Sequence, residues 1–401
     1  MANLRLLPFL LGFVALPCTA NADDPWPQFR GRHATGIGTG NPPVTWNMET
    51  GENVRWRTAI EGLGHSSPIV WGNRVFATTA VNVGNPSPSL ETGWLGGTGK
   101  AAEDTGSWSW QVHCYDLATG LLVWRREAAV GEPLRKRHLK ASHANCTPAT
   151  DGRYVVAFFG SEGLYCFDID GNLKWRTGFG LLHAGPYNAT EYEWGCASSP
   201  VIYEGHVIVQ CDYLNMSFLA ILRLEDGVEV RRIPRNDVAT WSTPLVMPVD
   251  GRAYIVCNGY LEMAGYDFGT GERLWFLEGG GDIPVPTPLY ARGLFLLTNG
   301  HGRCPTYAVS PGARGDITPP VEGPPDAAGA GDAAEDAAAV QRPSGVVWHE
   351  PRDGSYMPTP IVVGKHLYIC NDDGRLTVRD VDDGSMVYRQ RVGGGATYSA
   401  S

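Results

Sequence analysis

The sequence has no excess of positive charge and no long apolar run. Its 401 residues include 32 Lys and Arg against 42 Asp and Glu, which gives a net charge of −10. A protein that binds DNA or RNA by neutralising phosphates needs the opposite balance, so we expect no nucleic-acid partner. No segment approaches the roughly 20 consecutive apolar residues of a membrane-spanning helix, and no transmembrane segment is predicted.

Adjacent cysteines and C-x-x-C motifs are also absent. Eight cysteines follow the first 22 residues, and an even number permits disulfides in an exported chain. Several of them stand in apolar, strand-like runs, where Cys packs as a small hydrophobic residue. We therefore expect most of these cysteines to be buried free thiols and leave the pairing of any disulfide open.

The N-terminus has the pattern of a secretory signal over residues 1–22. A basic Arg5 precedes an apolar stretch at 6–16, and Ala20-Asn21-Ala22 fits an A-x-A cleavage site. The sequence thus predicts an exported protein of the periplasm, cell envelope or exterior. A lipid anchor at Cys18 is not expected, because Pro17 fits a lipoprotein cleavage site poorly.

A short motif, small or hydroxylated residues ending in proline, recurs along the whole chain. Its prolines are Pro68, Pro148, Pro200, Pro244, Pro288 and Pro360, separated by 80, 52, 44, 44 and 72 residues. Each is followed by an apolar pair, a turn and a β-branched or aromatic run of strand length. Four short strands in about 44 residues, repeated, is the period expected of propeller blades.

A second recurring motif has the form D-x-x-T-G-x-x-x-W. Asp can accept hydrogen bonds from nearby backbone N–H groups, and Gly takes the positive φ of a tight turn. The aromatic ring, four residues past the Gly on an outer strand, can reach the neighbouring unit. The predicted blade-docking residues are Asp116, Gly120, Trp124, Asp168, Gly171, Trp175, Asp267, Gly271, Trp275, Asp380 and Gly384.

This motif resembles that of the PQQ-type, quinoprotein-like β-propeller repeats, a family that includes quinoprotein alcohol dehydrogenases and the assembly lipoprotein BamB. The stretches at 26–31, 137–140 and 311–317 resemble exported, non-catalytic members of the family. The resemblance implies an all-β propeller of four-stranded antiparallel blades over residues 23–401. It is specific for fold and weak for function.

The resemblance implies eight blades, whereas the repeat starts predict six full ones and an opening seventh at the C-terminus. Asn53–Arg57 has the pattern of an outer fourth strand that would close the last blade. We therefore expect a propeller incomplete at its C-terminus. Two insertions are predicted: an ordered surface loop at 82–109 within the first blade, and a flexible Ala/Gly/Pro/Asp-rich segment at 311–345.

No combination of residues predicts catalysis or metal binding. Asp168–Asn172 lacks the later ligands of a calcium loop, and the pairs His143/Cys146 and His301/Cys304 supply two ligands where zinc needs three or four. The adjacent cysteines that pack on PQQ in the dehydrogenases are missing. No catalytic residue, no metal site and no cofactor are expected; PQQ with Ca²⁺ is the alternative.

Aromatic and imidazole side chains stand just upstream of each repeat start: His65, His143, Trp194, Trp241, Tyr356 and Tyr398. If the first strand of each blade lines the channel, these rings gather at one mouth of it. Such a site suits a sugar, a peptide or a flat cofactor. The alternative is that the rings only pack one blade against the next.

Together these features predict an exported, non-catalytic binding or scaffold protein of the cell envelope, with a role such as outer-membrane protein assembly. Its expected partner is a protein or a glycan. The alternative is an enzyme, either a PQQ-dependent oxidoreductase or another periplasmic enzyme with an unrecognised site. The sequence does not determine the ligand or the oligomeric state.

An open propeller exposes apolar strand edges, so we predict that the 401-residue chain expressed alone is unstable or aggregates. Thermal unfolding and light scattering after size exclusion measure this. A sharp cooperative transition from a monomer would contradict the prediction.

Overall fold

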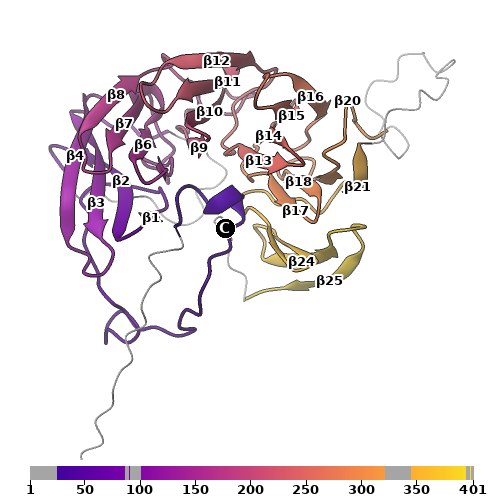
Figure 1. Cartoon of the computed structure of the whole chain (residues 1–401), viewed down its shortest axis with the longest axis horizontal. Coiled ribbons are helices and arrows are strands. Elements are labelled where there is room, and N and C mark those ends of the chain that lie inside the picture. Colours follow the sequence, from indigo (N-terminus) through magenta and orange to yellow (C-terminus); the bar gives the residue numbers. More distant parts are fainter. Residues whose placement is uncertain (1–24, 86–89, 91–100, 321–344, 394–397, 399–401) are drawn as a thin grey trace, which may run out of the picture.

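The computed structural model describes residues 25–85, 90, 101–320, 345–393 and 398. In this part of the chain, six sheets, each built on four antiparallel strands, follow one another around a common axis (Figure 1). The first strand of each sheet lies innermost and the last outermost, and two short 3-10 helices, η1 (Arg32–Ala34) and η2 (Gly160–Glu162), are the only helices there. The predicted all-β propeller is confirmed.

The first three blades are built as follows: β1 (Ile69–Trp71), β2 (Arg74–Asn82), β3 (Trp108–Asp116) and β4 (Leu122–Gly131); β5 (Ala149–Thr150), β6 (Tyr154–Phe158), β7 (Leu164–Asp168) and β8 (Leu173–Thr177); β9 (Val201–Tyr203), β10 (His206–Tyr213), β11 (Met216–Arg223) and β12 (Glu229–Pro234). Within each blade, consecutive strands pair with one another.

The other three are β13 (Leu245–Val249), β14 (Arg252–Cys257), β15 (Met263–Asp267) and β16 (Arg273–Leu277); β17 (Leu289–Ala291), β18 (Leu294–Thr298), β19 (Thr306–Val309) and β21 (Val346–Glu350); β22 (Ile361–Val363), β23 (His366–Cys370), β24 (Arg375–Asp380) and β25 (Met386–Arg391). The fourth blade gains a short fifth strand, β20 (Gly315–Asp316), which runs parallel to β16.

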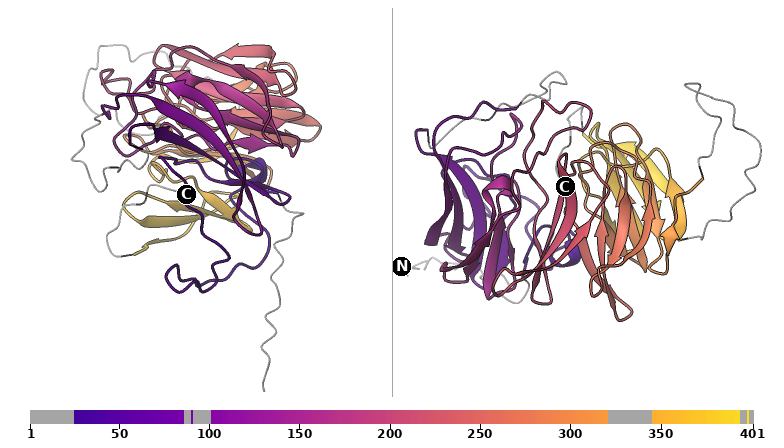
Figure 2. Two further views of the ribbon diagram at one scale, coloured as in Figure 1. Left: turned by 90° about the vertical axis from the view of Figure 1, so that its left-hand side faces the viewer. Right: turned by 90° about the horizontal axis from the view of Figure 1, so that it is seen from above.

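The apolar core lies between successive blades, which present apolar side chains to one another. One buried cluster joins Val156 and Phe158 of the second blade to Val207 and Val209 of the third. Similar clusters lie between the other pairs of successive blades. Viewed from the side, the sheets stand face to face (Figure 2), so each depends on its neighbours for burial.

The recurring proline motif links the blades near the axis. The residue before the proline donates its backbone N–H to the hydroxyl of the matching residue one blade on. The pairs are Ser67 to Thr147 (3.0 Å), Thr147 to Ser199 (2.9 Å), Ser199 to Thr243 (3.0 Å) and Thr287 to Thr359 (3.1 Å). Between the fourth and fifth blades, Ser242 Oγ donates to the Pro286 carbonyl instead, at 2.9 Å.

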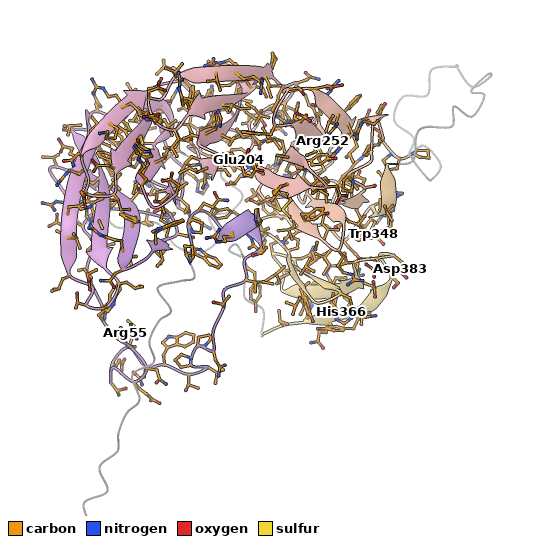
Figure 3. All side chains as sticks on the ribbon, in the orientation of Figure 1. Arg55, Glu204, Arg252, Trp348, His366 and Asp383 are labelled. Carbon is orange, nitrogen blue, oxygen red and sulfur yellow. The ribbon has the colours of Figure 1, made fainter. Side chains whose placement is uncertain are left out.

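The Asp–Gly turns at the opposite end of the blades receive an aromatic ring from the preceding blade. Trp124 donates its Nε1 to the Ile169 carbonyl at 3.1 Å, and its ring lies over Gly171, where a Cβ would come within 2.8 Å of it. Trp175 lies likewise over Gly227, with Nε1 2.8 Å from the Leu224 carbonyl. Trp348 takes the same position over Gly384, and Figure 3 labels it beside Asp383 of that turn.

The aspartates that open these turns cap the turn backbone. Asp116, Asp168, Asp267 and Asp380 each accept backbone N–H bonds of 2.7–3.1 Å from residues two to four positions on. The glycines Gly120, Gly171, Gly271 and Gly384 all have φ between +71° and +85°. Glycine is therefore required at this position for two reasons: the turn needs a positive φ, and the docking ring leaves no room for a Cβ.

Two docking positions depart from the motif. Arg231 replaces the ring over Gly271 and donates to the carbonyls of Phe268 and Gly269 at 2.9 and 2.8 Å. Trp275 is fully buried, lies over Gly265 of its own blade and faces Phe295 of the next at 6.3 Å between ring centroids. In the blade that follows Trp275, segment 311–345 replaces the tight turn.

Residues 53–57 form no strand in the described part of the chain, in contrast to the expected outer strand, and the sixth blade takes its four strands from 361–391. Trp56 nevertheless docks on the first blade. Its Nε1 lies 2.8 Å from the Leu117 carbonyl, and its ring covers Gly120. The segment runs outside the sheets, as the label of Arg55 shows in Figure 3.

Residues 26–34 cross the axis and touch the inner part of every blade (Figure 1). Trp26 pairs with Val70, the Pro27 carbonyl accepts from Thr150 N at 2.8 Å, and Gln28 accepts from Ile202 N at 3.3 Å. Arg30 donates to the Pro360 carbonyl at 2.9 Å, and η1 packs on β13 and β17. This segment therefore fills the hub.

The predicted insertions are described in part. Asn82 ends β2 and Trp108 begins β3, while 86–89 and 91–100 lie outside the described residues. In the second insertion, Ala313 and Ile317 are buried in the core between the fourth and fifth blades, so its first residues pack as part of the propeller. Residues 321–344, and the predicted signal at 1–22, lie outside the described residues.

The docking contact predicts different costs for two glycine substitutions at positive φ. Gly251→Ala, at φ +79° with open space around the new Cβ, should cost about 1–2 kcal/mol of backbone strain. Gly171→Ala adds the overlap with Trp124 and should cost a further ~1–3 kcal/mol. Urea unfolding of both variants measures the difference; equal losses would mean that the ring does not hold this contact.

Candidate functional site

Three of the six aromatic and imidazole residues predicted for the channel mouth lie in one cluster. Trp241 is 8% exposed and packs with Ile283, and Trp194 and Tyr356 lie against this cluster. The ring centroids of Trp194 and Trp241 are 5.4 Å apart with planes tilted by 38°. Trp241 Nε1 donates to the Gly195 carbonyl at 2.8 Å, so this ring is fixed from both its apolar and its polar side.

The other three predicted residues lie elsewhere. His65 is exposed, and its backbone N–H donates to the Ala144 carbonyl at 3.0 Å. Tyr398 donates its hydroxyl to the Val392 carbonyl at 2.8 Å and covers Gly374 of the last blade. His143 is held at the boundary between the first two blades.

His143 lies in a buried polar group with Asp104 and Arg137. Its Nε2 lies 2.9 Å from Asp104 Oδ2, and Arg137 donates to both oxygens of the same carboxylate at 2.8 and 3.0 Å. Burial acts to raise the pKa of Asp104, but the hydrogen bonds from His143 and Arg137 hold it below its usual value. The edges of Trp108 and Trp110 face the imidazole. This group anchors the first insertion to the wheel.

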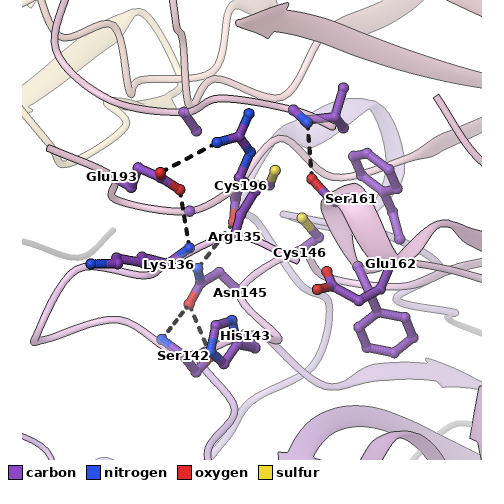
Figure 4. A pocket seen from close by; sticks show the side chains of 16 residues that line it. Arg135, Lys136, Ser142, His143, Asn145, Cys146, Ser161, Glu162, Glu193 and Cys196 are labelled. Carbon is purple, nitrogen blue, oxygen red and sulfur yellow. Dashed lines mark hydrogen bonds and ion pairs between the residues drawn. The ribbon is translucent and has the colours of Figure 1, made fainter. Parts of the chain in front are cut away.

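A small cavity beside His143 is a packed boundary between blades (Figure 4). Its volume is about 20 Å³, roughly the space of one water molecule. Several polar groups around it have partners: Glu193 accepts from Arg135 and from Lys136 N, and Asn145 donates to the Cys196 carbonyl at 3.0 Å. Arg135 Nε is buried and has no hydrogen-bond partner among the described residues. Burial raises the pKa of Cys196 to about 12, which disfavours the thiolate that a nucleophilic cysteine needs.

The loops around the mouth add rings that the sequence analysis did not nominate. Tyr187 stacks on Tyr260 with centroids 4.8 Å apart, and their hydroxyls lie 3.0 Å from each other. His301 is hydrogen-bonded to Asp282 and lies 5.3 Å from the Tyr356 ring. Tyr187 is 38% exposed and neighbouring Leu261 43%. These residues form the open part of the mouth.

A buried charge network fixes the loop that carries Tyr260. Arg235 pairs with Asp212 and Asp237, and all three side chains are fully buried. Asp237 accepts backbone N–H bonds from Val238, Tyr260 and Leu261 at 2.9–3.1 Å. Burial, together with the Asp212 carboxylate, raises the pKa of Asp237 to about 7. The Arg235 guanidinium thus pairs with two carboxylates. Asp237 therefore stays protonated to a higher pH than an ordinary aspartate.

These residues do not fit PQQ with Ca²⁺. The sequence has no adjacent cysteines, and the Trp194 and Trp241 rings pack on each other rather than facing across a slot. Within the described ranges, no group of three or more His, Cys, Asp or Glu side chains could hold a metal ion. The arrangement offers ring edges and hydroxyls for binding.

Comparison with known proteins places the chain in a family. Residues 109–324, just over half of the chain, match the family model described as outer membrane protein assembly factor BamB. The chain belongs to this family of PQQ-like repeat propellers. No curated protein matches the chain. Over the described residues, no helix is long and apolar enough to cross a membrane.

Solved structures of similar shape include BamB from Moraxella catarrhalis, at 14% identity over 73% of this chain and 72% of that one, with a TM-score of 0.45. A europium-containing methanol dehydrogenase matches at 12% identity over 85% and 80%, and a quinohemoprotein alcohol dehydrogenase from Pseudomonas putida at 13% over 86% and 68%, both with a TM-score of 0.46.

The raised pKa of Asp237 predicts a pH dependence of stability. Because the folded state binds this proton more tightly than the unfolded state, the free energy of unfolding should fall as pH rises from about 4 to about 7. Asp237→Asn removes the titrating group, so its stability relative to the wild type should rise between pH 5 and pH 8. Urea unfolding of both proteins at the two pH values tests this; an unchanged difference would contradict it.

Proposed function

We propose that this chain is an exported, non-catalytic binding protein that holds a polypeptide partner at its channel mouth. The observation that carries the proposal is the convergence of aromatic side chains from four separate loops on one face of a rigid wheel. Tyr and Trp supply large contact areas at low entropic cost and are enriched in protein interfaces. The family description, outer membrane protein assembly factor, agrees with a protein partner in the cell envelope.

The exposure of the rings favours a polypeptide over a glycan. A sugar stacks on an open ring face, but Trp241 is only 8% exposed and the faces of Tyr187 and Tyr260 cover each other. What remains open is a mixture of ring edges, hydroxyls, Leu261 and the His301–Asp282 pair. Such a surface matches side chains of mixed polarity, as a protein partner presents them.

Export is part of the proposal. It is supported by the signal pattern at 1–22 and by the family's association with the outer membrane. The expected compartment is the periplasm or the cell envelope.

Site-directed photo-crosslinking tests the proposal. A photo-crosslinking amino acid replaces Leu261 at the mouth or, as a control of similar exposure, Leu122 on an outer strand. Exposed to envelope extract of the source organism, the Leu261 protein should crosslink to a discrete protein partner and the Leu122 protein should not. Combining Tyr187→Ala with Tyr260→Ala should lower the yield about tenfold, as loss of ~1.4 kcal/mol of binding predicts; Tyr388→Ala on β25 should not.

Two results would contradict the proposal. One is equal crosslinking from both positions, or a yield indifferent to the tyrosine substitutions. The other is an absorbance change and alcohol oxidation when PQQ and Ca²⁺ are added, which would establish the oxidoreductase alternative.

A further inference from the structure

Three cysteines lie together at the boundary between the second and third blades. Cys146 stands just before β5, Cys196 lies in the link that leads to β9, and Cys211 is on β10. Cys146 and Cys211 belong to the buried apolar cluster between these two blades, and Cys196 packs against it. All three are free thiols in the structure. A chain that folds in an oxidising compartment can join thiols that meet in this way.

Hydrogen bonds on either side of Cys146 place it beside Cys196. The side-chain amide of Asn145 donates to the Cys196 carbonyl at 3.0 Å, and the backbone N–H of Thr147 donates to Ser199 Oγ at 2.9 Å. The residue before Cys146 and the residue after it are thus both tied to the segment that carries Cys196. The two cysteines are held side by side by contacts that do not involve their sulfurs.

The two thiols share a cavity that gives them room to approach each other. Among the described residues that line the cavity of about 20 Å³ at this boundary, Cys146 and Cys196 are the only cysteines, and Figure 4 shows both side chains at its wall. Gly160 faces Cys196 there. A Cβ on Gly160 would lie 2.6 Å from Cys196 Sγ, so a larger residue would push this thiol away.

We propose that Cys146 and Cys196 form a disulfide that joins the second blade to the link before the third. The two thiols lose two protons and two electrons. A disulfide oxidant such as glutathione disulfide takes up the electrons and is reduced to two thiols. The bond closes a loop of 49 intervening residues, which contains the whole of the second blade. It therefore restricts the unfolded chain more than a short loop would.

The disulfide forms while the chain folds and not afterwards. Burial raises the pKa of Cys196 to about 12 and that of Cys146 well above its usual value. Since only the thiolate attacks a disulfide oxidant, the buried thiols of the folded chain react slowly. In the unfolded chain both thiols are exposed and have ordinary pKa values. Once the disulfide has formed, the same burial shields it from reductants.

Peptide mapping tests the proposal on the chain refolded from urea in a mixture of reduced and oxidised glutathione. Free thiols are blocked with N-ethylmaleimide in denaturant before digestion after Lys, Arg and Glu. This digestion releases Cys146 in peptide 141–153 and Cys196 in peptide 194–204, and cleavage at Glu204 separates Cys196 from Cys211. We expect these two peptides to be joined by a disulfide. Because the oxidant is supplied, the result does not depend on whether the protein is exported.

Oxidation should also lower the equilibrium constant of unfolding at least about thirtyfold, as a disulfide across a long loop predicts. Cys146→Ala should abolish this gain. Cys257→Ala, which removes a fully buried thiol between the third and fourth blades, should keep it. Urea unfolding of the reduced and oxidised forms of each protein measures the difference. If Cys146→Ala does not fold, the peptide map of the unsubstituted chain decides.

The proposal is overturned if the peptides of Cys146 and Cys196 both carry N-ethylmaleimide, or if either is joined to another peptide, such as that of Cys211. A stability gain that survives in Cys146→Ala would overturn it too. Glutathione disulfide added to the folded, reduced chain should form the bond at least tenfold more slowly than during refolding. Equal rates would overturn the order of oxidation and folding.

Discussion

The sheets of this protein carry apolar faces that neighbouring sheets bury, and the arrangement of the blades follows from the need to cover these faces. A sheet so built is not stable alone, so successive blades pack on one another along the chain. The burial of Val156 and Phe158 against Val207 and Val209 is one instance of a contact that recurs at each blade boundary. Because the sequence repeats, one chain forms a series of sheets with matching apolar faces.

Packing alone does not set the angle or the register between blades; polar contacts at the two ends do. Near the axis, the residue before the motif proline donates a hydrogen bond to the next blade at four of the five boundaries between successive blades. At the other end, a Trp covers the glycine of the next turn and donates to its carbonyl. Where both contacts are present, two neighbouring blades are held together at both ends. The loops that form the mouth therefore stand on a rigid frame.

The fold was predictable because its signals are local. An Asp that caps its own turn and a Gly at positive φ act within a few residues, and they repeat. The prediction fails where the next blade lacks the Asp–Gly turn. Trp275 has the same local motif as Trp124, but in the next blade segment 311–345 replaces the turn that Trp275 would cover. Asp104, which binds His143, comes from an insertion that no repeat position predicts.

Much of the open mouth could not be predicted for the same reason. Trp194, Trp241 and Tyr356 stand at one repeat position and were foreseeable, whereas Tyr187, Tyr260 and His301 come from loops of unequal length that meet only in the assembled wheel. A partial signal existed: Asn258-Gly259 and Asn299-Gly300 recur after the second strand of successive blades and tie them together at 2.8–2.9 Å. The buried Arg235 network leaves no trace in the motif pattern.

The central claim is that hydrogen bonds of the proline motifs lock neighbouring blades together. Amide hydrogen exchange at Thr147 and Ser199 tests it most directly, because these N–H groups lie outside every strand and bond only to a hydroxyl of the next blade. The account predicts that they exchange as slowly as core strand amides, near the rate of global unfolding. Exchange as fast as that of the surface turn at 72–73 would show that the blades are not joined in this way.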